Sequence, residues 1–253
     1  MTTPPPAAPA APSPSPAPAA APHGAGQWAL EWIKSIGFAL VVWLVLRTFL
    51  FEAFRIPSES MENTLLVGDF LFVNKAVYGA EVPLLGWHLP KVRDPVHGDI
   101  VVFRGVEPDH IMIVKRVIGT AGDTLEMRDH VIYRNGVALE EPFARYTEGA
   151  QPDPPEYRAK MHDWQVGHLV GRDTTGYWPD RDHWGPIVVP QDSLFVMGDN
   201  RDSSYDGRYW GFLPRENVRG TPLFIYYTFD KDTYKPMAYF TNIRWGRIGH
   251  VPK

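Results

Sequence analysis

The sequence contains no cysteine, so disulfide bonds and thiolate metal ligands are both excluded. It also lacks a strong charge bias, because 25 Lys and Arg residues stand against 29 Asp and Glu residues, which gives a formal net charge of −4. Proteins that bind nucleic acid usually carry a basic patch or stripe, and this chain has no long basic cluster. We therefore do not expect nucleic acid as a partner.

A metal-binding signature is also missing. The chain has nine histidines, but they are scattered, mostly through its polar second half, and the motif H-E-x-x-H does not occur. Histidines placed in this way are typical of surfaces and loops. We expect no metal site and no cofactor.

The N-terminal residues 1–26 are poor in large apolar side chains. They consist mainly of Pro and Ala with a few Ser, a composition that cannot offset the entropy lost on ordering. We expect a disordered or polyproline-like tail. The remainder of the 253 residues is long enough for one large domain or two small ones.

The most apolar run follows this tail, and we expect an anchor helix over residues 27–54. No charge lies between Lys34 and Arg47, and the apolar core at residues 36–51 is slightly shorter than the roughly 20 residues that cross a bilayer. The Arg47 guanidinium lies close enough to the end of the run to reach the interface. The few flanking charges do not determine the orientation by the positive-inside rule.

An apolar run of this kind has two alternatives to an anchor. A cleaved signal peptide would begin near Met1 and end in a small-x-small site, whereas Phe51 places a bulky ring where a small residue is needed. A buried core helix of a soluble protein is the second alternative, and composition alone leaves it open.

Beyond residue 54 the pattern changes to short segments rich in β-branched and aromatic residues, bounded by Gly, Pro and Asp. Six such segments predict strands, at residues 69–79, 99–104, 110–119, 130–139, 193–199 and 221–229. The pair Asn135-Gly136 predicts a type I′ hairpin inside the fourth segment. We expect a mainly antiparallel β domain of Greek-key or sandwich type over residues 55–253, with a loop-rich insertion at about 140–190.

A possible nucleophile lies in the stretch "PSESMENTL", residues 57–65, directly after the anchor. Serine is a weak nucleophile until a base takes its proton, and the elbow G-x-S-x-G is absent around Ser60. Lys115 could supply the base, because at strand period it shares a face with Ile111, Ile113 and Val117, and burial can lower the pKa of a lysine from about 10.4 to about 7 to 8. Arg116 would point the other way and stay charged outside. The residues alone leave open a solvent-exposed lysine and a serine that caps a turn.

Four blocks in order resemble the bacterial type I signal peptidases, or leader peptidases, which are serine proteases with a Ser-Lys dyad. "PSESMENTL" is similar to P-S-x-S-M-x-P-T-L, and "GDFLFVNK" (68–75) follows it. "VKRVIGTAGD" (114–123) contains the lysine, and "MGDNRDSSYDGRYWG" (197–211) is similar to M-G-D-N-R-x-x-S-x-D-S-R-x-W-G. The departures from the motifs affect turn rigidity rather than the groups that the chemistry needs: Asn63 and Ala121 for Pro, Ser203 for Asn, and Gly207 for Ser.

The resemblance implies a signal-peptidase-like β domain and a role for each matching residue. Ser60 would be the nucleophile and Lys115 the general base. The Ser58 hydroxyl and the Ser60 backbone N–H would form the oxyanion hole, and Ser204 would hydrogen-bond to the Lys115 amine. Four charged residues would support the loop that carries Ser204: Asp199, Arg201, Asp206 and Arg208.

The resemblance also implies a substrate and a location. The substrates would be secreted preproteins, cut after small residues at the first and third positions before the scissile bond. Apolar residues would line the two shallow pockets for these positions: Ile56, Pro57, Met61, Leu65, Val114, Phe54, Leu71 and Val102. The enzyme would be a single-pass protein of the bacterial inner membrane, with its catalytic domain outside the cytoplasm. The lipid bilayer and the secretion translocon are the other candidate partners.

Two competing functions share part of this pattern. A repressor-type self-cleaving protease shares the Ser-Lys chemistry but would carry a DNA-binding helix-turn-helix in place of the anchor. A membrane-tethered β domain that only binds partners would use the same motifs as turns. The effect of substituting Ser60 and Lys115 on cleavage distinguishes these readings.

Overall fold

A computed structural model describes residues 25–82, 87–108, 111–147, 151–171, 173–231 and 237–253. The chain divides into two units, residues 1–43 and 44–253. The expected Pro/Ala tail lies almost wholly outside the described residues.

The first described element is the helix α1 (Ala25–Phe49). Its stretch Trp28–Phe49, 22 residues long, is long and apolar enough to cross a membrane. The helix is shorter than expected at its C-terminal end, because Phe51–Arg55 forms strand β1 instead of continuing the anchor. β1 pairs antiparallel with β2 (Asp69–Asn74), with Phe51 opposite Asn74. Pairing with β2 therefore makes residues 51–55 a strand, although their composition continues that of the apolar helix.

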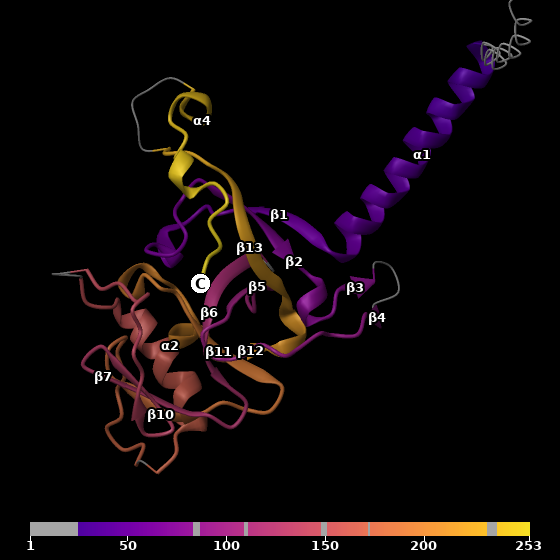
Figure 1. Cartoon of the computed structure of the whole chain (residues 1–253). Helices are drawn as coiled ribbons and strands as arrows, with labels where there is room; N and C mark the ends of the chain where they lie inside the picture. Colours follow the sequence, from indigo (N-terminus) through magenta and orange to yellow (C-terminus); the bar gives the residue numbers. More distant parts are fainter. Residues whose placement is uncertain (1–24, 83–86, 109–110, 148–150, 172, 232–236) are drawn as a thin grey trace, which may run out of the picture. The chain divides into compact units, whose positions relative to one another are not determined.

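The rest of the second unit is mainly antiparallel β, as the sequence predicts (Figure 1). A seven-stranded sheet has the order β1-β2-β13-β5-β6-β11-β12, and a four-stranded sheet has the order β10-β7-β8-β9. The further members of the large sheet are β5 (Ile100–Arg104), β6 (Met112–Thr120), β11 (Ser193–Met197), β12 (Leu213–Pro214) and β13 (Val218–Thr228). The smaller sheet contains β7 (Thr124–Arg128), β8 (Val131–Arg134), β9 (Val137–Ala138) and β10 (Trp184–Val188), and β3 (Glu81–Val82) pairs with β4 (Trp87–His88).

Strand β13 joins the two parts of the large sheet. It pairs with β2 on one side and β5 on the other, and its register shifts at several points along both ladders. Such bulges bend a strand and increase its twist, so β13 curves from one partner to the other (Figure 1). At one of these points Gly220 lies so close to β2 that an added Cβ would be 2.4 Å from the Asn74 carbonyl oxygen.

The predicted hairpin is present between β8 and β9. Asn135 and Gly136 have φ angles of 54° and 78°, as a type I′ turn requires at both central positions. The insertion is less loop-like than expected, because it contains the helix α2 (Pro155–Gln165) and strand β10. The α2 residue Met161 packs into an apolar cluster with residues of β7, β8, β10 and β11, so this region is part of the folded domain.

Two other short α-helices are α3 (Gly207–Trp210) and α4 (Ala238–Thr241). Two further apolar clusters fill the large sheet. One gathers residues of β1, β2, β5 and β13, and includes Met61 and Leu65. The other gathers residues of β5, β6, β11 and β13. Strand β6 is central, between β5 and β11, and its residues are therefore well placed to hold a buried polar side chain.

Candidate active site

A single turn of 3₁₀ helix, Glu59–Met61, holds Ser60. The next residue, Met61, is 1% exposed and anchors the turn in the apolar cluster below. The Ser60 carbonyl oxygen accepts a hydrogen bond of 3.1 Å from the backbone N–H of Asn200. The turn is thus fixed by packing on one side and by the loop at residues 198–206 on the other.

Strand β6 brings Lys115 to this turn. The Lys115 Nζ atom lies 2.6 Å from the Ser60 Oγ atom, although the two residues are 55 positions apart in the chain. Lys115 is only 3% exposed and lies opposite Val101 in the β5–β6 ladder. The structure therefore brings the candidate nucleophile and the candidate base within hydrogen-bonding distance.

Burial determines the electrostatics of Lys115. Removal from water destabilises the ammonium form and lowers the pKa of Lys115 to about 8. The carboxylates of Asp206 and Asp199 act in the opposite direction, and the Arg208 guanidinium adds to the lowering. A substantial fraction of Lys115 is therefore neutral near pH 8, and only the neutral amine can accept a proton.

Ser58 and Ser204 are the other two predicted polar residues. The Ser58 Oγ atom lies 3.4 Å from the Ser60 Oγ atom, on the exposed side of the turn. Ser204 is buried, but its hydroxyl has no hydrogen-bond partner of good geometry among the described residues. The expected hydrogen bond from Ser204 to the Lys115 amine is therefore not formed in this structure.

Gly198 explains how closely these groups are packed. A Cβ atom added there would lie 2.3 Å from the Ser204 Oγ atom and 2.4 Å from the Ser60 carbonyl oxygen. Any side chain would separate the nucleophile turn from the loop that carries Ser204. Glycine is required at this position because of the close approach, and not because of its φ angle.

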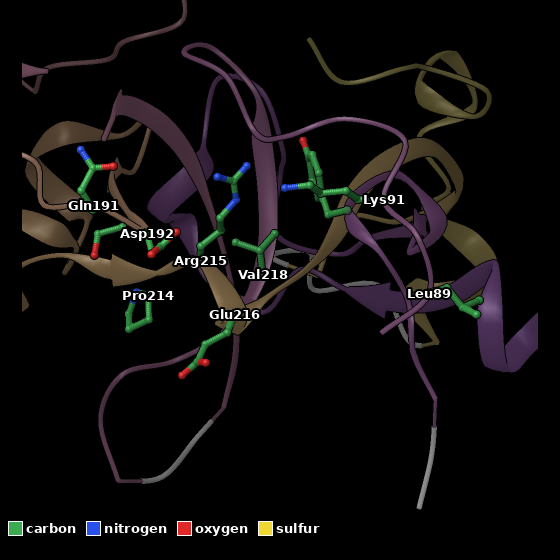
Figure 2. Close-up of a pocket in the computed structure, with 10 residues that line it drawn as sticks. Leu89, Lys91, Gln191, Asp192, Pro214, Arg215, Glu216 and Val218 are labelled. Atoms are coloured by element: carbon green, nitrogen blue, oxygen red, sulfur yellow. The ribbon is translucent and has the colours of Figure 1, made fainter. Parts of the chain in front are cut away.

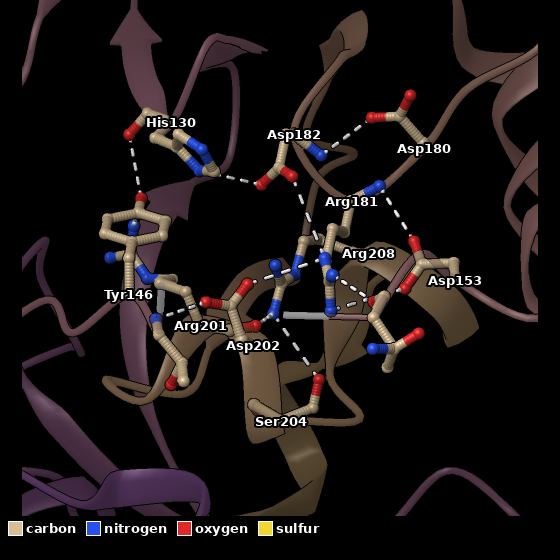
Figure 3. A network of polar contacts seen from close by, with 12 residues as sticks. His130, Tyr146, Asp153, Asp180, Arg181, Asp182, Arg201, Asp202, Ser204 and Arg208 are labelled. Atoms are coloured by element: carbon tan, nitrogen blue, oxygen red, sulfur yellow. Dashed lines mark hydrogen bonds and ion pairs between the residues drawn. The ribbon is translucent and has the colours of Figure 1, made fainter. Parts of the chain in front are cut away.

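An ion pair with no exposed atoms shapes that loop. The Arg208 Nε atom lies 2.9 Å from the Asp206 Oδ1 atom, and both side chains are 0% exposed. Although burial opposes ionisation, Arg208 holds the pKa of Asp206 below its ordinary value. Arg208 also donates to the backbone carbonyls of Arg201 and Ser204 (Figure 3), so the pair folds residues 201–208 back on themselves.

Arg116 corrects one expectation from the sequence. It was expected to point outward, but it is 2% exposed. Its Nε and Nη2 atoms donate to the Asp199 carboxylate at 2.8 and 2.7 Å. Asp199 thus pairs with Arg116 rather than assisting Asp206. Arg201 instead binds the Glu141 carboxylate at 2.7 and 2.8 Å.

A hollow of about 300 Å³ opens directly beside the serine and the lysine. It is lined on one side by Ser58, Ser60 and Lys115. The other lining residues are mostly apolar, with one acid: Val106, Glu107, Ile111, Ile113, Ser203, Tyr205 and Trp210. An apolar hollow that contains a serine and a buried amine can bind a peptide segment and attack its carbonyl carbon.

Comparisons with known proteins identify one family. The family model described as "Signal peptidase, peptidase S26" matches residues 29–227. The chain belongs to this family. Signal peptidase I of Pseudomonas aeruginosa is 34% identical over 227 residues, which cover 85% of this chain and 78% of that protein. Signal peptidase I of Aquifex aeolicus is 32% identical over 225 residues, which cover 78% of this chain and 83% of that protein.

Another member of the signal peptidase family, signal peptidase I P of Bacillus subtilis subsp. natto, is 34% identical over 201 residues, covering 79% of this chain and 89% of that protein. A solved structure of a signal peptidase I from Enterococcus faecalis is 27% identical and covers 52% of this chain and 98% of that chain. Its TM-score of 0.34 is too low to support an argument from the superposition.

The predicted pocket residues of this signal peptidase are only partly open to solvent. All except Pro57 lie in or against one apolar cluster. Five of these residues are at most 3% exposed: Ile56, Met61, Leu65, Leu71 and Val102. Only Phe54 and Val114 are half-buried, and Pro57 is exposed.

The residues that line the hollow beside Ser60 were mostly missed. Ile111 and Ile113 could have been assigned, because the strand period already places them on the Lys115 face. Tyr205, Trp210 and Glu107 come from other parts of the chain, and no local pattern indicates their position. A larger groove of about 650 Å³, lined by Lys91, Asp192 and Arg215 among others (Figure 2), includes none of the predicted site residues.

No group of three or more His, Cys, Asp or Glu side chains is arranged to hold a metal ion within the part of the chain that the structure describes.

Proposed function

We propose that the chain is a membrane-anchored endopeptidase that removes signal peptides from secreted preproteins, with Ser60 as nucleophile and Lys115 as general base. The observation that carries this proposal is the distance of 2.6 Å between the Lys115 Nζ and Ser60 Oγ atoms at a buried position. Membership in the signal peptidase family supports the substrate class.

In the first step, the neutral Lys115 amine takes the proton of the Ser60 hydroxyl while the Oγ atom attacks the scissile carbonyl carbon. The carbonyl oxygen becomes an oxyanion, and the Ser58 hydroxyl and the Ser60 backbone N–H are the candidate donors to it. The C–N bond then breaks, and the Lys115 ammonium returns its proton to the departing amine. The products are the free N-terminus of the mature protein and an ester of the signal peptide on Ser60.

In the second step, water attacks the ester carbonyl carbon and gives a proton to Lys115. The C–O bond to Ser60 breaks, and the Oγ atom takes the proton back from the ammonium group. The signal peptide leaves as a carboxylic acid, and the dyad is restored. Arginine could not replace Lys115 in either step, because a guanidinium does not lose its proton at working pH.

The preference for small residues before the cut belongs to this proposal. The apolar side chains of Phe54 and Val114 are half-buried next to the serine turn, and a bulky wall leaves space only for Ala, Gly or Ser. An extended substrate would add main-chain hydrogen bonds along a strand and place alternate side chains against this wall.

The lipid bilayer is the proposed partner that holds the enzyme at the place of the reaction. α1 is apolar enough to span a membrane, and the second unit carries exposed aromatic side chains on and beside α4. Phe240 is 69% exposed and Trp245 is 72% exposed, while Tyr239 packs against Phe240 at 4.6 Å between ring centroids. Exposed aromatic groups of this kind are suited to the interface of a membrane.

The location follows from the substrate. The cut sites of secreted preproteins emerge on the outer face of the inner membrane, so we place residues 55–253 outside the cytoplasm and the tail inside. Contact with the secretion translocon would bring the preprotein to the same surface.

The test uses the full chain in detergent with a preprotein that carries an Ala-x-Ala site. We expect the parent protein to release two products whose masses place the cut directly after the second Ala. Ser60→Ala and Lys115→Met should each abolish the cut, whereas replacing each His in turn should preserve it. Cleavage that survives in either dyad variant would refute the proposal, and shortening of the enzyme itself in place of the preprotein would indicate a self-cleaving protease.

A further inference from the structure

Residues 141–147, which we call the bridging segment, follow β9 at the start of the insertion. Its contacts are concentrated on two loops that are far away in the chain, the serine turn at residues 59–65 and the loop at residues 198–206. The loop carries Ser204, and the turn carries Ser60. The bridging segment is therefore placed to fix one relative to the other.

On the serine turn, the segment makes two contacts. The Asn63 Nδ2 atom donates a hydrogen bond of 3.0 Å to the Phe143 carbonyl oxygen. The Arg145 Nη1 atom lies 2.7 Å from the Glu62 Oε2 atom. Both partners on the turn lie within three residues of Ser60, so the segment is attached close to the nucleophile.

On the other loop, the contacts are mostly through the backbone. The Arg145 N–H donates to the Asp199 carbonyl at 2.7 Å, and the Arg145 carbonyl accepts from the Arg201 N–H at 2.9 Å. The Arg201 guanidinium also donates to the Glu141 carboxylate and, at 3.1 Å, to the Tyr146 hydroxyl. These contacts leave the backbone of residues 199–201 little conformational freedom.

The side chain of Phe143 reaches the strand that carries the lysine. Its ring centroid lies 3.8 Å from the Cζ atom of Arg116, which is the residue next to Lys115. Arg116 is held at the same time by Asp199 and by the carbonyl oxygens of Gly98 and Lys253. The aromatic ring therefore covers a buried cation that is also held by polar contacts.

Asn63 occupies the position where the signal peptidase motif has proline, and its backbone excludes proline here. Its φ angle is +101°, whereas the pyrrolidine ring fixes φ near −65°. Asparagine tolerates positive φ better than most residues. In place of the rigid proline ring, this chain has the side-chain amide of Asn63, which is hydrogen-bonded to the Phe143 carbonyl oxygen.

We propose that the bridging segment is a positioning element for the serine–lysine pair, and that Phe143 on the segment and Asn63 on the serine turn are positioning residues. This inference rests on the proposed function, since it assigns residues that act through Ser60 and Lys115. Asn63 holds the serine turn to the segment, and Phe143 holds the segment to the strand of the lysine. Neither residue lines the hollow beside Ser60, so neither is expected to touch substrate.

The first test changes the ring of Phe143. We expect Phe143→Leu to lower kcat about tenfold through loss of the contact with Arg116 and a small displacement of the dyad. KM should stay within about twofold, because substrate contacts are intact. Phe143→Tyr retains the aromatic face and should restore kcat. The matched control is Tyr133→Leu, which removes an aromatic ring 5.1 Å from Arg128 on the other sheet and should leave kcat unchanged.

The second test changes Asn63. Asn63→Gly retains the positive φ but loses the amide donor, and we expect kcat to fall several-fold. Asn63→Pro, which restores the motif, should be worse, because its φ cannot be adopted. Asn135→Gly is the matched control, since Asn135 also has a positive φ and donates to Asp123 at 2.8 Å, and it should leave kcat unchanged.

The results separate this inference from the proposed function. All variants are compared below their own unfolding transitions, measured by circular dichroism. An unchanged kcat in both Phe143→Leu and Asn63→Gly, or equal loss in Phe143→Tyr and Phe143→Leu, would overturn the positioning role while Ser60→Ala stays inactive. Activity in Ser60→Ala would instead overturn the proposed function itself.

Discussion

The two cations Lys115 and Arg116 are neighbours on β6, and both are almost fully buried, at 3% and 2% exposure. Their surroundings differ in one respect. Lys115 has a hydroxyl group at 2.6 Å and no carboxylate at hydrogen-bonding distance within the described residues, whereas Arg116 has a carboxylate on two of its nitrogen atoms. Arg116 therefore retains its charge beside the Asp199 carboxylate. Lys115, which faces only apolar groups and the Ser60 hydroxyl, favours the neutral amine.

The comparison shows how one strand can serve two purposes. Burial without an anion lowers the pKa of Lys115, which suits it to the proposed role of general base. Burial with an anion makes Arg116 part of the framework, because Asp199 also accepts a hydrogen bond of 2.5 Å from the Thr64 hydroxyl on the serine turn. Asp199 therefore links Arg116 on β6 to the turn that carries Ser60.

The largest effect is expected for Lys115→Arg, which gives positions 115 and 116 the same side chain. Lys115→Arg places a cation that cannot lose its proton beside Ser60. We expect kcat to fall by about 10⁴-fold or more, as for removal of a base in other serine proteases. The measurement is single-turnover cleavage of a preprotein, with the exposed Lys91→Arg as the control. Retention of more than a tenth of the activity would show that the proton does not go to residue 115.

The next largest effect concerns the paired side. Asp199→Ala leaves the Arg116 charge buried without its partner, and such a loss costs about 3 to 5 kcal/mol of folding free energy. Chemical denaturation of the catalytic unit in the full chain measures it. The double variant Arg116→Met, Asp199→Leu removes both charges and should recover most of the loss. A cost below about 1 kcal/mol for Asp199→Ala would mean that water reaches Arg116.

A smaller effect of opposite sign is expected for Lys115→Met. The folded-state pKa of Lys115 is about 8 and its ordinary value is 10.5, so the unfolded chain binds more protons between these values. The parent protein therefore loses stability as the pH falls from 10.5 to about 8, by about 3 kcal/mol in total at 1.4 kcal/mol per unit. Met carries no charge, so the difference in unfolding free energy between variant and parent should be about 3 kcal/mol more favourable to the variant at pH 7 than at pH 10.5. An equal difference at both pH values would contradict a buried, neutral lysine.

Much of the fold could be predicted because the strands have local signals. β5 and β11 lie within predicted segments, β6 and β13 overlap theirs over most of their length, and Asn135-Gly136 identifies the hairpin turn. β1 could not be predicted, because its sequence continues the apolar composition of the anchor and its strand state depends on pairing with β2. β10 contains Gly185 and Pro186, which weaken a strand signal.

The residues of the candidate site, like the strands, could be predicted only where a local pattern indicates them. Ser60 and Lys115 could be assigned because they lie in motifs, and the strand period indicated an apolar face for the lysine. The burial of Arg116 could not be predicted, since its partner Asp199 lies 83 residues further along the chain. The contact of Phe143 with Arg116 could not be predicted either, because residues 140–190 have no periodic pattern. Long-range partners of charged groups are fixed by topology, and a local pattern does not encode them.

The most direct test of the account is a measurement of the pKa of Lys115 in the intact protein. Lysine labelled with ¹³C at Cε allows each amine to be titrated by NMR, and the Lys115→Met spectrum assigns the signal. The account predicts a midpoint near 8, well below the ordinary value of 10.5. A midpoint at or above 10.5 would show a charged amine throughout the working range and would contradict its role as the base.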